Sequence, residues 1–137
     1  MKLFTYSKLN RTQFTENDDV LEVEILKEIK HPNLVNFCDS GELLLDCQKY
    51  AYAVIDFISG ETLADKLKRE QSPNIYEAKD IILGVLNGLK YLHSLNNPII
   101  HNDITNLNVM LDLSGKRSIP KIIDFGYARY LSQSNKD

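Results

Sequence analysis

The sequence is poor in the residues that build metal centres, disulfide frameworks and membrane spans. It has only two cysteines, Cys38 and Cys47, without metal-ligand spacing and without a partnering histidine. We therefore expect both to be free, buried thiols of a protein in a reducing compartment. No run approaches 18 consecutive apolar residues, and the first residues lack the apolar stretch of a signal peptide. This argues against a membrane partner and favours a cytoplasmic protein.

The sequence also lacks an excess of charge of either sign. Sixteen basic and 19 acidic residues give a net charge of −3, which leaves no basic surface for nucleic acid. The 137 residues are 43% hydrophobic and 26% charged, so the chain has an ordinary domain size and can build a hydrophobic core.

Short apolar runs alternate with polar residues between positions 99 and 126. The runs are Ile99-Ile100, Val109-Met110-Leu111 and Ile122-Ile123. They are too short for helices and rich in β-branched residues, so they predict small strands, with a hairpin turn around Gly115 between the last two. Pairing of these strands brings Asn108 and Asp124 to the same end of the ribbon, with Asp103 on the loop just before it. Three oxygen-bearing side chains that converge in this way can hold a divalent cation such as Mg²⁺.

These polar residues also form a motif. The pattern His101-x-Asp103-x-x-x-x-Asn108, followed by Asp124-Phe125-Gly126, resembles the catalytic loop and the metal-binding triplet of the protein kinase family. The resemblance implies that Asp103 accepts or orients the proton of the attacking hydroxyl, and that Asn108 and Asp124 hold Mg²⁺. It also implies that Phe125 packs inward, in a stack whose other members are Leu26, Phe37 and His101.

The first 35 residues predict a strand and a helix. Residues 1–6 predict the strand, and Asn17-Asp18-Asp19 predicts the cap of a helix with apolar residues from Val20 to Ile29, ended by Pro32. Residues 22–35 resemble the kinase C helix and the strand after it. The resemblance implies that Glu22 forms an ion pair with a lysine that grips the phosphates of ATP, and Lys2 lies at a plausible distance upstream. Glu24 is the competing glutamate, and Glu28 is a weaker one.

The next segment predicts two antiparallel strands, residues 33–46 and 48–57, around Asp39-Ser40-Gly41. The second strand resembles the one that enters the hinge between the two lobes of a kinase. The resemblance implies that Ile55 guards the back of the nucleotide pocket, that Asp56 and Ile58 offer backbone groups to adenine, and that Met110 also contacts the nucleotide. An ordinary edge strand that runs into a helix would give the same pattern.

Two helices follow. Residues 62–68 predict a short helix, and the segment after it gives the clearest helical pattern of the chain, over about five turns. Its apolar stripe comprises Ile75, Ala78, Ile82, Val85, Leu89 and Leu92. Gly84 and Gly88 indicate close packing against a neighbouring element, because the charged residues around them exclude a membrane dimer. His93 is better explained as a capping or packing residue than as a ligand.

The sequence departs from the kinase pattern at several points. Its six glycines never form the Gly-x-Gly-x-x-Gly loop that covers phosphates. Asn102 stands where the family usually has an arginine that can pair with a phosphorylated segment. Thr105 stands where serine/threonine kinases usually have a lysine that neutralises the γ-phosphate. We therefore expect a fragment or a truncated gene product.

The prediction is an α+β, protein kinase-like two-lobed fold, incomplete at both ends. A partial N-terminal lobe would comprise residues 1–57, and a partial C-terminal lobe residues 58–137. The expected function is transfer of the γ-phosphoryl of MgATP to a serine or threonine hydroxyl of a protein, with ATP and Mg²⁺ as cofactors and self-association through incomplete lobe surfaces. Two alternatives stay open: an inactive, pseudokinase-like binding module, and a small-molecule kinase-like phosphotransferase.

Overall fold

The computed structural model describes residues 1–70 and 74–134. The chain divides into two compact units: unit 1 contains Met1–Lys30 and Asn36–Asp56, and unit 2 contains His31–Val35 and the chain from Phe57 onward. Strands and helices occur in both, which confirms the predicted α+β class. Within the described residues, no helix combines the length and the apolar character that a membrane crossing requires.

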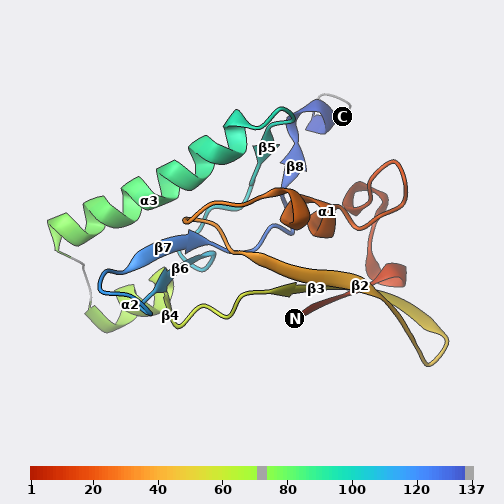
Figure 1. Ribbon diagram of the computed structural model, residues 1–137, viewed down its shortest axis with the longest axis horizontal. Coiled ribbons are helices and arrows are strands. Elements are labelled where there is room, and N and C mark those ends of the chain that lie inside the picture. The colour runs from red at the N-terminus through yellow and green to blue at the C-terminus, as the bar shows by residue number, and fades with distance from the viewer. Residues whose placement is uncertain (71–73, 135–137) are drawn as a thin grey trace. The chain divides into compact units, whose positions relative to one another are not determined.

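Unit 1 is a three-stranded antiparallel sheet with one helix. The strand order is β1 (Lys2–Thr5), β3 (Gln48–Ile55), β2 (Phe37–Leu45), so β3 lies in the middle of the sheet (Figure 1). Ala51 and Ala53 on β3 are buried because alternate residues of a strand face the same side. The helix α1 (Leu21–Glu28) buries Leu21, Val23, Ile25 and Leu26 in the core.

The boundaries of α1 differ from the prediction. Val20 occupies the N-cap position without a side-chain cap, so the expected capping by Asn17–Asp19 is wrong. The Thr15 hydroxyl instead accepts the N–H groups of Asn17 and Asp19 at 3.3 and 3.2 Å, which folds these residues into a turn before the helix. Two short 3₁₀ turns, Tyr6–Lys8 and Arg11–Gln13, precede this turn. The helix ends at Glu28, because Ile29 is already extended, and Pro32 is not what stops it.

The hairpin of β2 and β3 is predicted correctly, but its details are not. β2 continues through Asp39–Gly41, after an irregularity in its pairing between Phe37 and Asp39, and the chain reverses at Asp46 and Cys47, both with positive φ. Cys38 and Cys47 are exposed, contrary to expectation. One lies on a mostly solvated strand and the other in the turn, where the chain has no core to bury a thiol.

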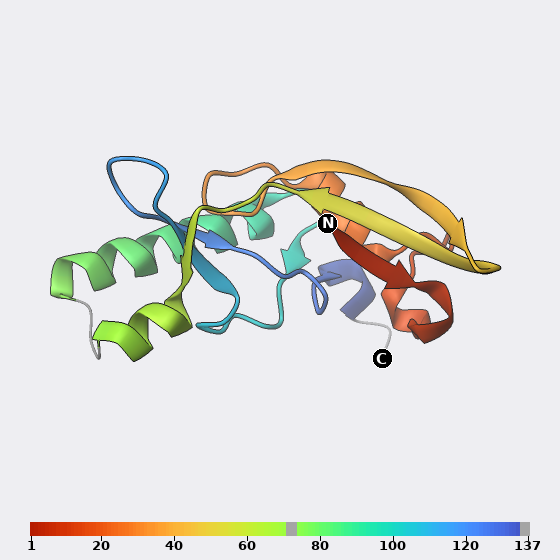
Figure 2. The same ribbon diagram turned by 90° about the horizontal axis from the view of Figure 1, so that it is seen from below.

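Unit 2 contains two small antiparallel sheets. In the first, β6 (Val109–Asp112) pairs with both β4 (Gly60–Thr62) and β7 (Ile119–Ile122). The turn of the β6–β7 hairpin extends beyond the strands (Figure 2). In the second, β5 (Ile99–Ile100) pairs with β8 (Arg129–Tyr130), just before α4 (Leu131–Ser134). The three predicted strands exist, but β5 does not join the hairpin.

The segment His31–Val35 belongs to unit 2 because it bonds to β7. The N–H of Val35 donates to the carbonyl of Ile122 at 2.9 Å, and the N–H of Ile122 donates to the carbonyl of Asn33 at 2.9 Å. The Asn33 side chain adds a bond to the carbonyl of Pro120 at 2.9 Å. Leu34 and Ile122 are both fully buried, so this segment forms part of the core of unit 2.

The longest helix, α3 (Ile75–Ser94), runs alongside the β6–β7 ribbon (Figure 1). Its buried residues are Ile81, Gly84, Gly88 and Leu92. The predicted stripe is therefore partly wrong, since Ile75 and Ile82 are 76% and 59% exposed. The expected close packing at the glycines is confirmed: a Cβ at Gly84 would lie 2.2 Å from Pro120, and one at Gly88 would lie 3.1 Å from Leu34. His93 is exposed in the last turn.

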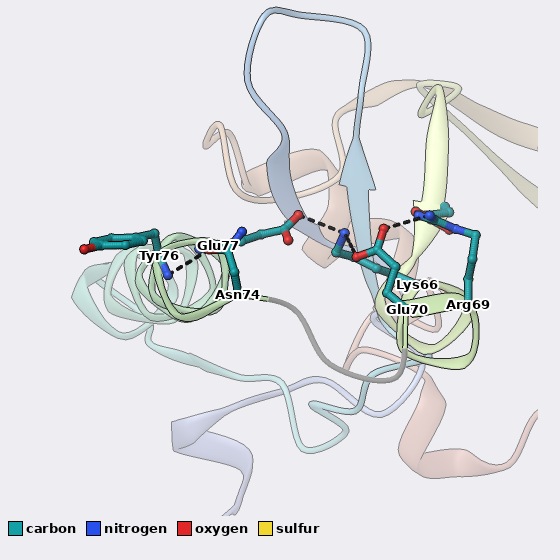
Figure 3. Close-up of polar contacts among 7 residues, drawn as sticks. Lys66, Arg69, Glu70, Asn74, Tyr76 and Glu77 are labelled. Carbon is teal, nitrogen blue, oxygen red and sulfur yellow. Dashed lines mark hydrogen bonds and ion pairs between the residues drawn. The ribbon is translucent and has the colours of Figure 1, made fainter.

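A buried lysine joins the two main helices of unit 2. Lys66 on α2 (Leu63–Glu70) is only 6% exposed, and its Nζ lies 2.6 Å from Glu70 of the same helix and 2.8 Å from Glu77 of α3 (Figure 3). These carboxylates raise the pKa of Lys66 more than burial lowers it, so the lysine stays charged. The ion pairs hold the start of α3 against α2.

Candidate active site

The loop between β5 and β6 carries the predicted catalytic residues of unit 2. Within it, the Nδ2 of Asn108 donates to the Asp103 carboxylate at 2.7 Å and to the Asp103 carbonyl at 2.9 Å. The Asn108 N–H donates to the carbonyl of Thr105 at 3.1 Å, which closes the loop on itself. Asp103 and Asn108 are therefore held as a pair, and both are half-buried.

Asp124 lies two positions after the end of β7. Its neighbour Ile123 donates its N–H to the carbonyl of Asn108 at 2.9 Å, so the hairpin brings residues 108 and 124 to the same end, as the sequence predicted. The Asp124 Oδ1 accepts the N–H of Gly126 at 3.1 Å, an Asx-type turn that orients the carboxylate. The N–H of Ala128 donates to the carbonyl of Phe125 at 3.0 Å, and this turn leads into β8.

His101 and Phe125 form the buried floor of this region. They are each 1% exposed, and their rings meet edge to face with centroids 4.9 Å apart. The inward packing of Phe125 is therefore present. The other two members of the predicted stack, Leu26 and Phe37, belong to unit 1, and their stacking on this pair stays a prediction.

The ionisation of His101 follows from its burial. Burial lowers the pKa of His101, while the charges of Asp103 and Asp124 oppose that effect only partly. The ring is therefore neutral at pH 7. Its Nδ1 accepts the N–H of Asp103 at 3.3 Å, so the proton lies on Nε2, which is buried and has no hydrogen-bond partner among the described residues. A contact with the backbone of Asp124 also favours the charged ring, although its geometry falls short of a hydrogen bond.

Two contacts that the sequence did not predict anchor this loop from outside. The N–H of Ala64, in the first turn of α2, donates to the carbonyl of Asn106 at 2.9 Å. β4 pairs with β6, and just beyond this pairing the N–H of Leu113 donates to the carbonyl of Ser59 at 2.8 Å. The Lys66 ion pairs that hold α2 to α3 therefore also stabilise the support of the loop that carries Asp103 and Asn108.

The remaining unit 2 residues predicted to touch the nucleotide are Ile58 and Met110. Ile58 is 8% exposed and lies just before β4. Met110 is half-buried on β6, between Thr62 of β4 and Lys121 of β7. Their contact with a nucleotide stays a prediction.

In unit 1, the ion pair expected from the sequence is present. The Nζ of Lys2 lies 2.7 and 2.9 Å from the two carboxylate oxygens of Glu22. The competing Glu24 pairs instead with Lys27 at 2.6 Å on the same helix. The Glu22 side chain is 10% exposed and that of Lys2 is 45% exposed, so the carboxylate is fixed while the ammonium meets solvent. Whether this lysine binds phosphate stays a prediction.

Ile55 is the last residue of β3 in unit 1, and Asp56 follows it. The Asp56 N–H donates to the carbonyl of Asn36 at 2.9 Å, and the Asp56 carboxylate accepts from the Asn36 amide and from the Cys38 thiol, each at 2.9 Å. The bond to Asp56 raises the pKa of the Cys38 thiol, which keeps it protonated. Because the N–H is taken, the carbonyl is the backbone group that Asp56 can offer to adenine.

The oxygen donors of Asn108 and Asp124 in unit 2 are too few to bind a hard cation without further ligands. Within residues 1–70 and 74–134, no three or more His, Cys, Asp or Glu side chains form a group that could hold a metal ion. Asn108 and Asp124 offer one amide oxygen and one carboxylate at the same end of the hairpin. A cation there would need oxygens from water and from a substrate, which is how Mg²⁺ binds nucleotide phosphates.

A cavity of about 700 Å³ lies elsewhere in unit 2, between the first half of α3 and the β6–β7 hairpin. Tyr76, Asp80, Leu83, Ser118 and Ile119 are among the residues that line it, and none of the lining residues is a predicted site residue. Its walls combine apolar side chains with charges of both signs, which favour no single class of ligand.

Comparison with known proteins supports the motif. The family model described as the protein kinase domain matches residues 2–137. Over 129 residues, 86% of this chain, the sequence is 35% identical to the probable serine/threonine-protein kinase PknB of Bifidobacterium longum. It is also 35% identical to the probable serine/threonine-protein kinase fhkD of Dictyostelium discoideum over 82% of the chain, and to the serine/threonine-protein kinase WNK of Caenorhabditis elegans over 93%.

These matches cover 18%, 14% and 7% of the three relatives, so the chain corresponds to a small part of each. The family match nevertheless extends over nearly all of the chain, from β1 to its last residues. It includes the loop with Asp103 and Asn108 and the turn with Asp124. The chain therefore belongs to the protein kinase domain family.

Proposed function

We propose that this chain is the nucleotide-binding and catalytic part of a protein kinase, which transfers the γ-phosphoryl of MgATP to a serine or threonine hydroxyl of a protein. The single observation that carries the proposal is the double hydrogen bond from Asn108 to Asp103, in a hairpin that holds Asp124 at the same end. The three relatives, each called a serine/threonine-protein kinase, support the choice of hydroxyl.

In this proposal Asp103 acts on the substrate hydroxyl. One carboxylate oxygen, Oδ2, accepts from Asn108, which fixes the plane of the carboxylate and leaves Oδ1 to accept the hydroxyl proton. Most of the rate in phosphoryl transfer comes from positioning and from charge stabilisation. A rigid Asp103 therefore contributes by holding the attacking oxygen in line.

The oxygens of Asn108 and Asp124 fit Mg²⁺. Because Nδ2 of Asn108 donates to Asp103, its Oδ1 is the atom that can face a cation. The Asp124 carboxylate is oriented through Oδ1 by the N–H of Gly126. When bound, the cation would neutralise charge on the phosphates. The protein contributes two oriented oxygen donors and leaves the other coordination positions to phosphate and water.

Unit 1 would bind the rest of the nucleotide. Lys2, fixed by Glu22, would grip the phosphates. Ile55 would border the adenine pocket, and the Asp56 carbonyl, together with backbone groups of Ile58, would bond adenine.

The second candidate function is a binding module of the same family without phosphoryl transfer. Thr105 favours it, because a hydroxyl at this position cannot supply the positive charge that a lysine would place near the γ-phosphate. Both candidates predict MgATP binding, but only the first predicts turnover that depends on Asp103.

Calorimetry and a transfer assay test the proposal. ATP affinity is measured with and without Mg²⁺ for the chain, for Asp124→Asn, and for Asp80→Asn, an exposed carboxylate on α3 that serves as the matched control. We expect Mg²⁺ to increase affinity in the chain and in the control but not in Asp124→Asn. Equal MgATP affinity in all three would contradict the metal site.

Transfer of radiolabelled phosphate to protein substrates is then compared between the chain and Asp103→Asn. The same comparison is made for any longer product of the gene. We expect the 137-residue chain on generic peptides to be no faster than Asp103→Asn, because Thr105 supplies no charge and the sequence has no glycine-rich phosphate loop. A difference that appears in a longer product supports the kinase, whereas equal rates in both support the binding module.

A further inference from the structure

Asn102 links two parts of the candidate active site. Its Nδ2 donates to the carbonyl of Tyr127 at 3.1 Å, although the two residues are 25 positions apart. Asn102 immediately precedes Asp103, and Tyr127 immediately follows the Asp124–Gly126 turn. The bond therefore joins the loop of the predicted base to the segment of the predicted metal ligand.

This bond extends the β5–β8 pairing with a side-chain donor in place of a main-chain donor. Ile99 pairs with Tyr130 and Ile100 with Arg129, so the same register places Asn102 opposite Tyr127. The Asn102 backbone cannot pair there, because its φ of 63° is left-handed and turns the chain out of the strand. The side-chain amide takes the place of the main-chain N–H.

The residue type suits both tasks. Asparagine tolerates the left-handed conformation better than most residues with a side chain. It also carries two amide N–H donors at short reach. Glycine would satisfy the backbone without the bond, and aspartate would adopt the backbone conformation but has no N–H to donate.

The segment from Asp124 to Tyr127 is then held at two points. The Phe125 ring packs edge to face against His101, and the Tyr127 carbonyl accepts a hydrogen bond from Asn102. Gly126 lies between these points, and its N–H is the donor that orients the Asp124 carboxylate. Release of Tyr127 would free Gly126 to rotate, and the carboxylate would lose its orientation.

We propose that Asn102 is a positioning residue: the hydrogen bond from its side-chain amide to the Tyr127 carbonyl holds the Asp124 carboxylate in the orientation that binds the cation. This proposal rests on the proposed function, in which Asp124 binds Mg²⁺. It assigns a role to the residue that stands in place of the arginine usual at this position.

The test uses two variants and one control. Asn102→Gly keeps the backbone conformation and removes the amide. Asn102→Asp keeps the size and places an oxygen against the Tyr127 carbonyl. Asn96→Asp, at an exposed asparagine in the loop before β5, introduces the same charge as the control. Amide hydrogen exchange at Gly126 reports the orienting bond, and the ratio of ATP affinities with and without Mg²⁺ reports the metal site.

We expect exchange at Gly126 to accelerate roughly two- to tenfold in Asn102→Gly, in line with the loss of one hydrogen bond, and further in Asn102→Asp. We expect the Mg²⁺-dependent gain in affinity to fall by a similar factor, while affinity for ATP without Mg²⁺ stays constant. The Asn96→Asp control should behave like the unmodified chain. If Asn102→Asp does not fold, Asn102→Gly decides alone.

Two results would overturn the proposal. Unchanged exchange in Asn102→Gly would mean that the residue only makes the turn. Faster exchange with an unchanged Mg²⁺ effect would mean that the bond holds the segment without serving the metal. If the unmodified chain shows no Mg²⁺ effect at all, the proposed function fails and the positioning role fails with it, whereas the exchange data still report whether the bond holds Gly126.

Discussion

Gly84→Ala and Gly88→Ala make the same chemical change on the same face of α3, and we expect them to affect stability differently. In the interior of a helix, alanine is more favourable than glycine by about 0.5–1 kcal/mol, because it restricts the unfolded chain. Space around the new methyl group decides whether that gain survives. A Cβ at Gly84 would lie 2.2 Å from the Cγ of Pro120, whereas at Gly88 the nearest atom would be the Leu34 Cδ2 at 3.1 Å.

At Gly84 the clash is severe. Carbon atoms make favourable contact at about 3.5–4.0 Å, so more than an ångström must be gained by movement. Pro120 has little freedom, because it is a buried ring on β7 and pairs with Leu111. Overpacking of this kind costs about 1–3 kcal/mol, occasionally more, so we expect Gly84→Ala to destabilise the chain by about 1–2 kcal/mol after the helix gain.

At Gly88 the neighbours need to move only a few tenths of an ångström. Two of them, the Leu34 Cδ2 and the Ile122 Cδ1, are the ends of side chains, and only the Asn33 carbonyl belongs to the backbone. We therefore expect Gly88→Ala to change the free energy of unfolding by less than about 0.5 kcal/mol in either direction.

Chemical denaturation of both variants and of the exposed control Asn87→Ala measures these differences. The control should gain about 0.5 kcal/mol from helix propensity alone. In thermal unfolding, a loss of 1–2 kcal/mol corresponds to a melting point lower by roughly 3–8 °C in a chain of this length. Equal destabilisation by Gly84→Ala and Gly88→Ala would refute the packing of α3 on Pro120.

Three further perturbations follow from the site. The folded-state pKa of His101 lies below its unfolded value of 6.5, so its contribution to stability is complete above about pH 6.5 and is lost as the pH falls through the folded pKa. Unfolding of His101→Phe should therefore depend less on pH in this range, with His31, whose pKa is also lowered, supplying part of the remaining slope. Lys66→Met should destabilise the chain by about 1–3 kcal/mol in urea titration, because Glu77 and Glu70 lose the buried ammonium, although both are about one-third exposed and Glu70 keeps its ion pair with Arg69. The control Lys68→Met, at a 77% exposed ammonium, should change stability by less than about 0.5 kcal/mol, and equal losses would contradict the role of burial. Phe125→Ala should cost about 3–5 kcal/mol by the same measurement, and a loss below 1 kcal/mol would mean that the ring is not part of the core.

The contacts within the candidate site were predictable where the residues that make them lie close together in the sequence, whereas the roles of these residues stay predictions. Asp103 and Asn108 are five positions apart, and the structure joins them by hydrogen bonds. Asp124 follows a hairpin whose turn the sequence marks with Gly115. The ion pair of Lys2 with Glu22 spans 20 positions, but the family pattern supplied its register.

Two predictions, the cap of α1 and the buried face of α3, were wrong because each relied on residue type alone. Asn17–Asp19 have the composition of a cap, but the N–H groups of Asn17 and Asp19 donate to the Thr15 hydroxyl, and the three residues form a turn of their own. Ile75 and Ile82 fit the helical period of α3, but the buried face is set by Gly84 and Gly88. A stripe defined by large apolar residues does not register glycine, although glycine allows the closest approach of a neighbouring strand.

Glycine also allows a close approach in the contacts that position the loop with Asp103 and Asn108, here between segments that are farther apart in the sequence. β4 consists of Gly60, Glu61 and Thr62, which lack the apolar alternation of a strand and include only one β-branched residue. It nevertheless pairs with β6, about 50 positions away, and this close approach requires glycine, since a Cβ at Gly60 would lie 1.8 Å from the carbonyl oxygen of Leu111. Three of the six glycines in the chain, Gly60, Gly84 and Gly88, thus mark close approaches between segments that are distant in sequence. A glycine in a segment without a turn signal is therefore informative about packing, since it identifies where another part of the backbone comes near even though it does not identify which part.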